Sequence, residues 1–105
     1  MVTKETAVFR ALADPTRRRI LDLLRRDELT VGALAARFRT SRPAVSRHLR
    51  KLRAVGLVRC ERRGTERLCR LNPEPLRALD AWLGDYRQFW RSRLHEWKAF
   101  SEKPT

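Results

Sequence analysis

Residues 28–58 read ELTVGALAARFRTSRPAVSRHLRKLRAVGLV, and this stretch decides the fold. Apolar residues spaced at i, i+3, i+4 and i+7 predict a helix that Thr30 caps and that extends to Phe38. A second helix is expected between Ser41, which can cap its first turn, and Gly56, which can adopt the left-handed conformation at its end. Two short helices joined by a tight polar turn predict a helix-turn-helix.

Two further helices are expected before this stretch. Asp14 is typical of an N-cap and the proline after it of a first helical position, and the apolar spacing that follows predicts a helix over 15–26. A short apolar stripe upstream predicts another helix over about 4–13. The members of that stripe are Phe9, Leu12 and Ala13.

The apolar period changes after the second helix of the motif. In residues 57–71, LVRCERRGTERLCRL, apolar residues recur at every second position, which predicts strands. A two-residue turn at 64–65 pairs residue 63 with 66 and Cys60 with Cys69, and it places both cysteines on the buried face. A helix-turn-helix followed by such a hairpin predicts a winged helix-turn-helix.

A long apolar helix is expected over 74–100, after the sequence NPEP. Its large apolar residues recur every seven positions in three rows: Leu76, Leu83, Trp90 and Trp97; Leu79 and Tyr86; Trp82 and Phe89. A single domain of 105 residues has little core left to cover so many aromatic rings. We therefore expect part of this helix to pack against a second copy; the alternative is that it folds back on its own domain.

The length is that of one domain, so we expect a single domain over 1–105. Its class is mainly α with a small β-hairpin, with about five helices plus a two-stranded wing. No apolar run reaches the roughly 18 residues of a membrane span, and residues 1–15 lack the pattern of a signal peptide. A cytoplasmic protein with no membrane partner is expected.

The charge of the chain forms a patch. The net charge is +13, and residues 37–63 hold ten basic residues and one acidic residue, whereas residues 74–100 hold five and four. A basic patch on a helix-turn-helix indicates double-stranded DNA as the partner, with the second helix in the major groove and the wing along the minor groove or backbone. The candidate DNA-binding residues are Ser41, Arg42, Ser46, Arg47 and Arg50 on the helix and Arg62, Arg63 and Arg67 on the wing.

The ordered motifs resemble one known family. ALADPTRRRILDLL at 11–24, ELTVGALAARF at 28–38 and SRPAVSRHLRKLRAVGLV at 41–58, with a short wing after them, look like the ArsR/SmtB family of bacterial transcriptional repressors. The resemblance implies a homodimer built from the first and last helices, residues 1–13 and 74–100, on a palindromic operator near its own promoter. The expected interface residues are Phe9, Leu79, Leu83, Tyr86, Trp90 and Trp97.

The departures from the family concern its signals. Metal-sensing members carry cysteines where this chain has Thr30 and Gly32, and others carry Asp and several His on the last helix, which here has only His95. Thr30 and Gly32 supply no soft thiolate, and His95 alone does not make the second site. No metal and no cofactor is therefore expected, and the effector stays unknown. The family commonly has Gln at the position of Arg42, so base preference there is expected to differ. We expect His48 to be structural, with a phosphate contact as the alternative.

Three interpretations of Cys60 and Cys69 stay open. The two residues can be small hydrophobes, a reversible disulfide that acts as a redox switch, or ligands of a soft metal. Two rival functions also remain: a nonspecific nucleic-acid-binding protein, and a protein–protein module that uses the last helix. An enzyme is not expected, because no nucleophile–base pair, phosphate-binding glycine loop or metal triad is evident.

Overall fold

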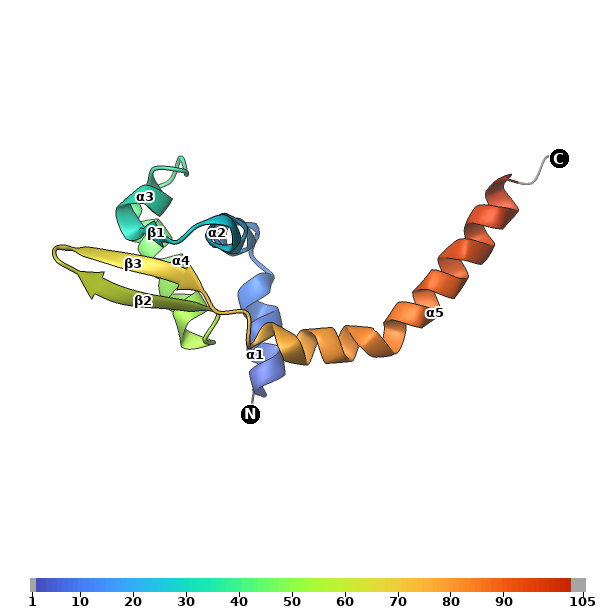
Figure 1. Ribbon diagram of the computed structural model, residues 1–105. Coiled ribbons are helices and arrows are strands. Elements are labelled where there is room, and N and C mark those ends of the chain that lie inside the picture. The colour runs from blue at the N-terminus through green and yellow to red at the C-terminus, as the bar shows by residue number, and fades with distance from the viewer. Residues whose placement is uncertain (1, 103–105) are drawn as a thin grey trace.

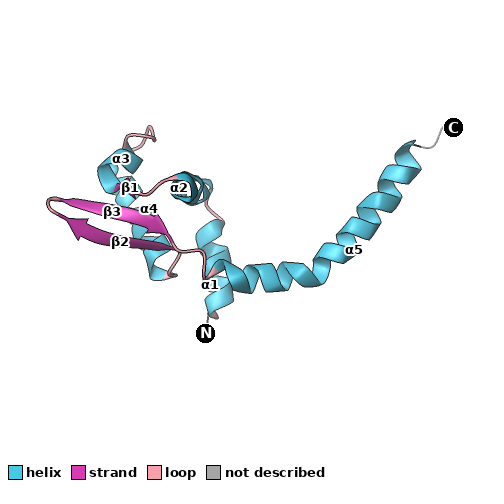
Figure 2. Ribbon diagram, in the orientation of Figure 1, coloured by secondary structure: helices cyan, strands magenta, loops and turns pink. Residues whose placement is uncertain are grey.

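The computed structural model describes residues 2–102, and it is mostly helical with a small antiparallel sheet (Figures 1 and 2). The elements are α1 (Lys4–Leu12), α2 (Pro15–Arg26), β1 (Leu29–Thr30), α3 (Val31–Ala35), α4 (Arg42–Ala54), β2 (Val58–Arg63), β3 (Glu66–Leu71) and α5 (Leu76–Glu102). This architecture confirms the predicted winged helix-turn-helix class. Met1, the first residue of the expected dimerisation segment, lies outside the described residues.

Polar caps begin the first four helices. Thr3, Asp14, Thr30 and Ser41 each accept a hydrogen bond from the backbone N–H three residues later. Each side chain satisfies one N–H group that the helix itself leaves free, which fixes where the helix starts. The starts of α2, α3 and α4 are therefore those that the sequence predicts.

Two helix boundaries differ from the prediction. The regular part of α3 ends at Ala35 and not at Phe38, because i→i+3 bonds tighten the last turn, with Phe38 N donating to Ala35 O at 3.1 Å. The helix expected from residue 74 begins at Leu76. Before it, Asn72 Oδ1 accepts a hydrogen bond from Glu74 N at 3.3 Å, and this turn occupies the positions assigned to the helix.

The wing belongs to a three-stranded sheet with the order β1-β3-β2, rather than to a two-stranded one. The predicted hairpin register is confirmed, with Arg63 opposite Glu66, Cys60 opposite Cys69 and Val58 opposite Leu71. The third strand, β1, was missed because two residues are too short to show a period, and it pairs with β3 through Leu29 and Cys69. Cys69 therefore lies on the central strand.

The core of the domain lies between α2, α3, α4 and the base of the sheet. Its fully buried side chains include Ile20, Leu34, Val45, Leu52, Leu57 and Cys69. On α1 the fully buried residues are Val8 and Ala11; of the predicted stripe, Leu12 is partly buried against the core, whereas Phe9 and Ala13 are exposed. Phe9 is 38% exposed and packs edge-on against Trp82 of α5 at 5.5 Å between ring centroids.

Helix α5 leaves this body and projects into solvent, on the side opposite the wing tip (Figure 1). The radius of gyration is 18.2 Å, well above the roughly 13 Å of a compact chain of about 100 residues. Near its start Leu79, which is 6% exposed, is buried in the core and Leu76 packs against it; the exposed fraction reaches 73% at Phe100. No helix within residues 2–102 is long and apolar enough to cross a membrane.

Candidate nucleic-acid interface

Helix α4 is held by its apolar side and presents its basic side outward. Val45, Leu49 and Leu52 are at most 3% exposed and pack into the core. Arg47 is two residues from both Val45 and Leu49, which at 100° per residue places it opposite them, and its side chain is exposed. The geometry leaves one complete face of α4 available to a partner.

The two faces of the wing differ in their charges. On one face Arg63 and Arg70 both contact Glu61, at 3.0 and 3.1 Å, and Arg70 also lies 3.7 Å from Glu28. On the other face Arg62 and Arg67 are opposite each other, and neither has an ion pair among the described residues. Strand alternation thus places the two arginines paired with Glu61 on one face of the wing and Arg62 and Arg67 on the other.

A groove of about 370 Å³ separates α4 from the free face of the wing. Five of the eight candidate DNA-binding residues line it: Arg42, Ser46, Arg50, Arg62 and Arg67. The other three lie outside it. Ser41 caps α4, Arg47 is on the outermost line of the helix, and Arg63 is paired with Glu61.

Arg53 also lines this groove, although it is not among the candidate DNA-binding residues named from the sequence. It is eleven residues after Arg42, three turns along the same side of α4, and this spacing was the available signal. The groove therefore carries five arginines against one acid, Glu66. So dense a positive potential between two projecting elements suits a polyanion.

Arg42 spans the turn between the two helices. A Cβ placed on Gly32 of α3 would lie 3.7 Å from Nη1 of Arg42, so the guanidinium group covers the small residue at that position. Gly32 and the guanidinium group of Arg42 therefore lie against each other at the edge of the groove. Arg42 thus belongs to both halves of the helix-turn-helix.

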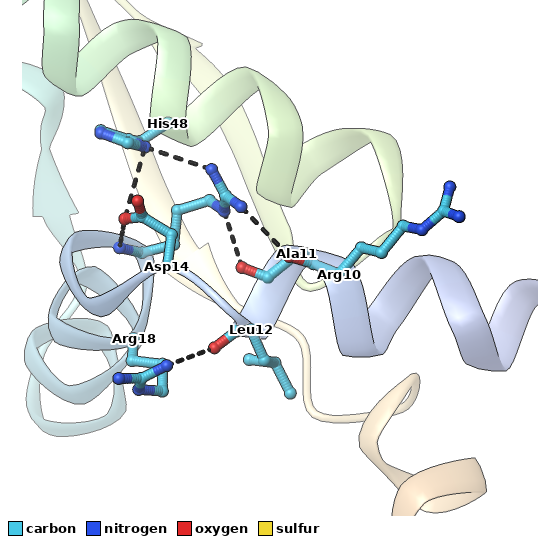
Figure 3. Close-up of polar contacts among 7 residues, drawn as sticks. Arg10, Ala11, Leu12, Asp14, Arg18 and His48 are labelled. Atoms are coloured by element: carbon cyan, nitrogen blue, oxygen red, sulfur yellow. Dashed lines mark hydrogen bonds and ion pairs between the residues drawn. The ribbon is translucent and has the colours of Figure 1, made fainter.

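His48 joins α4 to the start of α2 (Figure 3). Its Nδ1 lies 3.8 Å from Asp14 Oδ2 and 3.5 Å from Nη1 of Arg17. Arg17 in turn donates to the carbonyl oxygens of Ala11 at 2.6 Å and Arg10 at 3.1 Å, at the end of α1. These contacts hold three helices together and support the structural role expected for His48.

Asp14 sits at the centre of this cluster. The hydrogen bond from the Arg17 backbone lowers the pKa of Asp14 below its ordinary value of 3.8. Desolvation opposes this shift, and the nearby His48 and Arg17 add smaller lowering effects. A carboxylate that stays ionised both caps α2 and attracts the guanidinium group of Arg17. The orientation of α4 therefore depends partly on a charge at the first turn of α2.

Asn72 fastens the end of α4 to the start of α5. Its Nδ2 donates to the carbonyl oxygen of Gly56 at 2.8 Å, and its backbone N–H donates to Leu57 O at 2.8 Å. Gly56 can form this turn because its φ of 80° is open to glycine. We call these contacts the Asn72 clamp.

Cys60 and Cys69 are cross-strand neighbours at the base of the wing, and both are free thiols. Cys69 is fully buried, whereas Cys60 is half-buried and lines the groove. Desolvation, helped by a hydrogen bond that the Cys69 thiol donates to Cys60, raises the pKa of Cys69 to about 12. The Cys69 thiol is therefore protonated at neutral pH.

The positions that carry metal ligands in metal-sensing relatives have other roles here. The hydroxyl of Thr30 caps α3, and Gly32 accommodates Arg42. His95 lies on the exposed part of α5. Within residues 2–102 no three His, Cys, Asp or Glu side chains gather as a metal site would require.

Comparisons with known proteins place this geometry among transcription factors. A helix-turn-helix domain family matches residues 12–61. The transcriptional repressor SdpR of Bacillus subtilis is 38% identical over 76 residues, which cover 72% of this chain and 84% of SdpR.

Two solved structures have the same fold along most of their length. An ArsR family transcriptional regulator is 36% identical with a TM-score of 0.77, over 85% of this chain and 98% of that chain. The homodimeric winged helix-turn-helix DNA-binding domain of Mb0332 from Mycobacterium bovis is 32% identical with a TM-score of 0.66, over 81% and 82%. At identities of 36% and 32%, these proteins resemble the chain in sequence as well as in fold.

Proposed function

Since the chain belongs to the ArsR family of winged helix-turn-helix transcriptional regulators, we propose that it is a homodimeric repressor of its own operon. It binds a palindromic operator in the cytoplasm, and an unidentified non-metal signal releases it. The groove between α4 and the wing is the observation that carries this proposal, because it gathers five arginines around a helix that a major groove can receive.

The roles of the candidate residues follow from their positions. Arg47, on the outermost line of α4, reads a base edge, and Arg42 and Ser46 stand beside it. Arg50 and Arg53 bind phosphate, and Arg62 and Arg67 hold the backbone or the minor groove. Ser41 positions the helix through its cap and donates its hydroxyl proton to a phosphate.

The aromatic side of α5 supports the homodimer. Leu83, Tyr86, Trp90 and Trp97 of the expected interface are between 36% and 68% exposed in the single chain, and Phe9 extends this surface. A monomer rarely leaves so much contiguous apolar area in water. A second copy would cover it and hold two α4 helices about 34 Å apart, one turn of DNA. Leu79 differs from the others because its own chain already covers it.

The first experiment selects sequences from a random duplex pool and measures affinities at fixed salt. We expect a palindrome, bound roughly 10³-fold or more tightly than random DNA, and the same palindrome near the gene itself. Equal affinity for all duplexes would overturn the proposal in favour of a nonspecific nucleic-acid-binding protein. An absence of DNA binding would instead favour the rival function of a protein–protein module that uses the last helix.

Two neighbouring arginines provide a matched pair for the wing. Arg62 faces the groove, whereas Arg63 faces Glu61, so Arg62→Ala and Arg63→Ala remove the same charge from opposite faces. We expect Arg62→Ala to lower the slope of log affinity against log salt by about 0.9, the value for one phosphate contact. Arg63→Ala should change it less, and the reverse order would contradict this placement.

A redox-responsive repressor is the second candidate, and the opposed cysteines favour it. Residues 63 and 66 flank a two-residue turn, so the pairs alternate and Cys60 and Cys69 form a closely spaced, non-hydrogen-bonded pair. One molecule of hydrogen peroxide oxidises the two thiols to a disulfide and is reduced to two molecules of water. The bond would pull the floor of the groove together.

Mild peroxide tests this candidate. Operator affinity is measured before and after treatment of the wild type and of Cys60→Ser. The redox candidate predicts a loss of affinity that dithiothreitol reverses and that Cys60→Ser lacks. Unchanged affinity in a sample shown by mass spectrometry to be oxidised would exclude it.

A further inference from the structure

A second cavity lies where α1, the end of α4 and the start of α5 meet. Its volume is about 770 Å³, within the roughly 300–1,000 Å³ typical of small-molecule sites. Its walls are mostly apolar and include Ala7 and Val8 of α1, Val55 after α4, and Ala78 of α5. None of the six expected interface residues lines it, so the cavity and the aromatic side of α5 use different residues.

Two walls of this cavity are joined to each other by hydrogen bonds. The Asn72 clamp joins the turn after α4 to the start of α5, which form two of the three sides. Gly56 packs closely there, because a Cβ at this position would lie 3.5 Å from Cγ of Pro75. A site that exists before its ligand arrives loses little affinity to ordering.

The charges around the cavity are unbalanced. Three cations line it, and Arg77 is paired with Glu74 at 3.2 Å. Lys4 and Arg53 have no ion pair with any carboxylate in the part of the chain that the structure describes. An apolar cavity with two unpaired cations complements a ligand that joins an apolar body to a negative group.

We infer that this cavity binds a small amphiphilic anion, a carboxylate on an alkyl or aryl body, and that Arg53 transmits its presence to the DNA-facing groove. This inference rests on the proposed function, for which it supplies the class of the missing signal. Among the described residues, 2–102, Arg53 is the one that lines both the cavity and the groove. A carboxylate bound to its guanidinium competes with a phosphate for the same charge.

The binding test uses octanoate with 1-octanol as its uncharged counterpart, titrated by calorimetry into the full chain without DNA. Amide spectra of the labelled protein locate the site. We expect shifts at Ala7, Val55 and Ala78, and binding of octanol at least about tenfold weaker, because a charge-assisted hydrogen bond is lost. The absence of octanoate or 1-naphthoate binding, or shifts confined to the Trp97 indole, would overturn the inference.

Four exposed positions give the variants. Lys4→Gln and Arg53→Gln should each weaken octanoate about tenfold, whereas Arg26→Gln, an equal charge change on α2, should not. Ala78→Phe fills the cavity from an exposed position and should abolish octanoate binding while operator affinity and melting temperature stay unchanged. Equal effects of all three glutamine variants would overturn the site.

Operator affinity with and without octanoate then tests the transmission. We expect a loss of about three- to tenfold in the wild type, the effect of one phosphate contact, and none in Arg53→Gln. Octanoate that binds without changing operator affinity would overturn the role of Arg53. Should the protein show no operator preference at all, the proposed function fails, and calorimetry without DNA still decides whether the cavity is a site.

Discussion

The helix-turn-helix body and helix α5 are built from similar apolar residues, but they bury them to very different extents. In the body Ile20, Leu34 and Leu52 are completely buried by their own chain. Along α5 the exposed fraction is 6% at Leu79, 38% at Trp90 and 68% at Trp97. The body is therefore complete in one copy, whereas α5 is a helix whose apolar side lacks a partner.

The contrast extends to charge. The body carries the arginine-lined groove, whereas residues 74–100 are close to neutral, so nucleic acid is attracted to one region only. The apolar area on α5 and the positive potential on the body thus point to different partners. We expect substitutions in α5 to weaken dimerisation, so that their effects depend on protein concentration. Substitutions in the body should change folding or DNA binding directly.

Trp90→Glu should give the largest effect. A charge in the proposed interface replaces a large aromatic ring, so the dimer dissociation constant should rise by at least about 10²-fold, or roughly 3 kcal/mol. Sedimentation equilibrium measures the constant, and operator affinity should fall with it. Gln88→Glu adds the same charge on the polar side of α5 and is the control; a dimer of unchanged strength in Trp90→Glu would refute the proposed interface.

Leu52→Ala tests the opposite region. Leu52 is fully buried beneath α4, so we expect a loss of about 2–5 kcal/mol in the free energy of unfolding. Urea denaturation at two protein concentrations measures it. A loss that is the same at both protein concentrations indicates that the core forms within one chain. A loss that changes with concentration would show that the core, like α5, depends on the second copy.

Arg47→Ala should affect recognition and leave folding intact. We expect a loss of about 1–3 kcal/mol in operator affinity and a relaxed preference at one base pair, because Arg47 is on the outermost line of α4. Lys51→Ala removes an equal charge from the same helix and should weaken all sequences alike. Binding to a set of single-base operator variants measures both; an unaltered preference in Arg47→Ala would count against base contact.

The smallest effect concerns pH. The pKa of Asp14 is lowered in the folded protein, so its ionised form adds stability above its ordinary pKa of 3.8, and that stability is lost as pH falls through the lower folded value. Asp14→Asn should therefore lower the melting temperature near neutral pH but not in strong acid. Asp22→Asn, on an exposed site of α2, is the control. A difference that persists in strong acid would place the effect elsewhere.

The elements of the body with strong local signals could be predicted from the sequence. The caps at Asp14, Thr30 and Ser41 fix three helix starts, and the turn at 64–65 fixes the hairpin register. These features depend on hydrogen bonds and side-chain period within a few residues. They also sufficed to separate the outward side of α4 from its buried side.

Features that depend on distant contacts could not be predicted. β1 has only two residues and exists because β3 is there to pair with it, and Asn72 shows no sign in the sequence that its amide reaches Gly56. On α1 the small residue Ala11 is buried and the large Phe9 is not, because the helix packs closely on its neighbours. Arg53 was not named as a DNA-binding candidate for the same reason, because the groove that it lines forms only when the wing folds beside α4.

The Asn72 clamp has a consequence for the spacing of an operator. In the proposed dimer, the paired α5 helices connect the two helix-turn-helix bodies, and each Asn72 clamp sets the angle between α5 and its body. If α4 lies about 17 Å from the clamp, which is half the one-turn spacing, a change of about 5° in this angle displaces α4 by roughly 1.5 Å. An inserted base pair shifts a half-site by about 3.4 Å and turns it by about 35°. A rigid clamp would therefore make operator binding depend on the spacing between half-sites as well as on their base sequence.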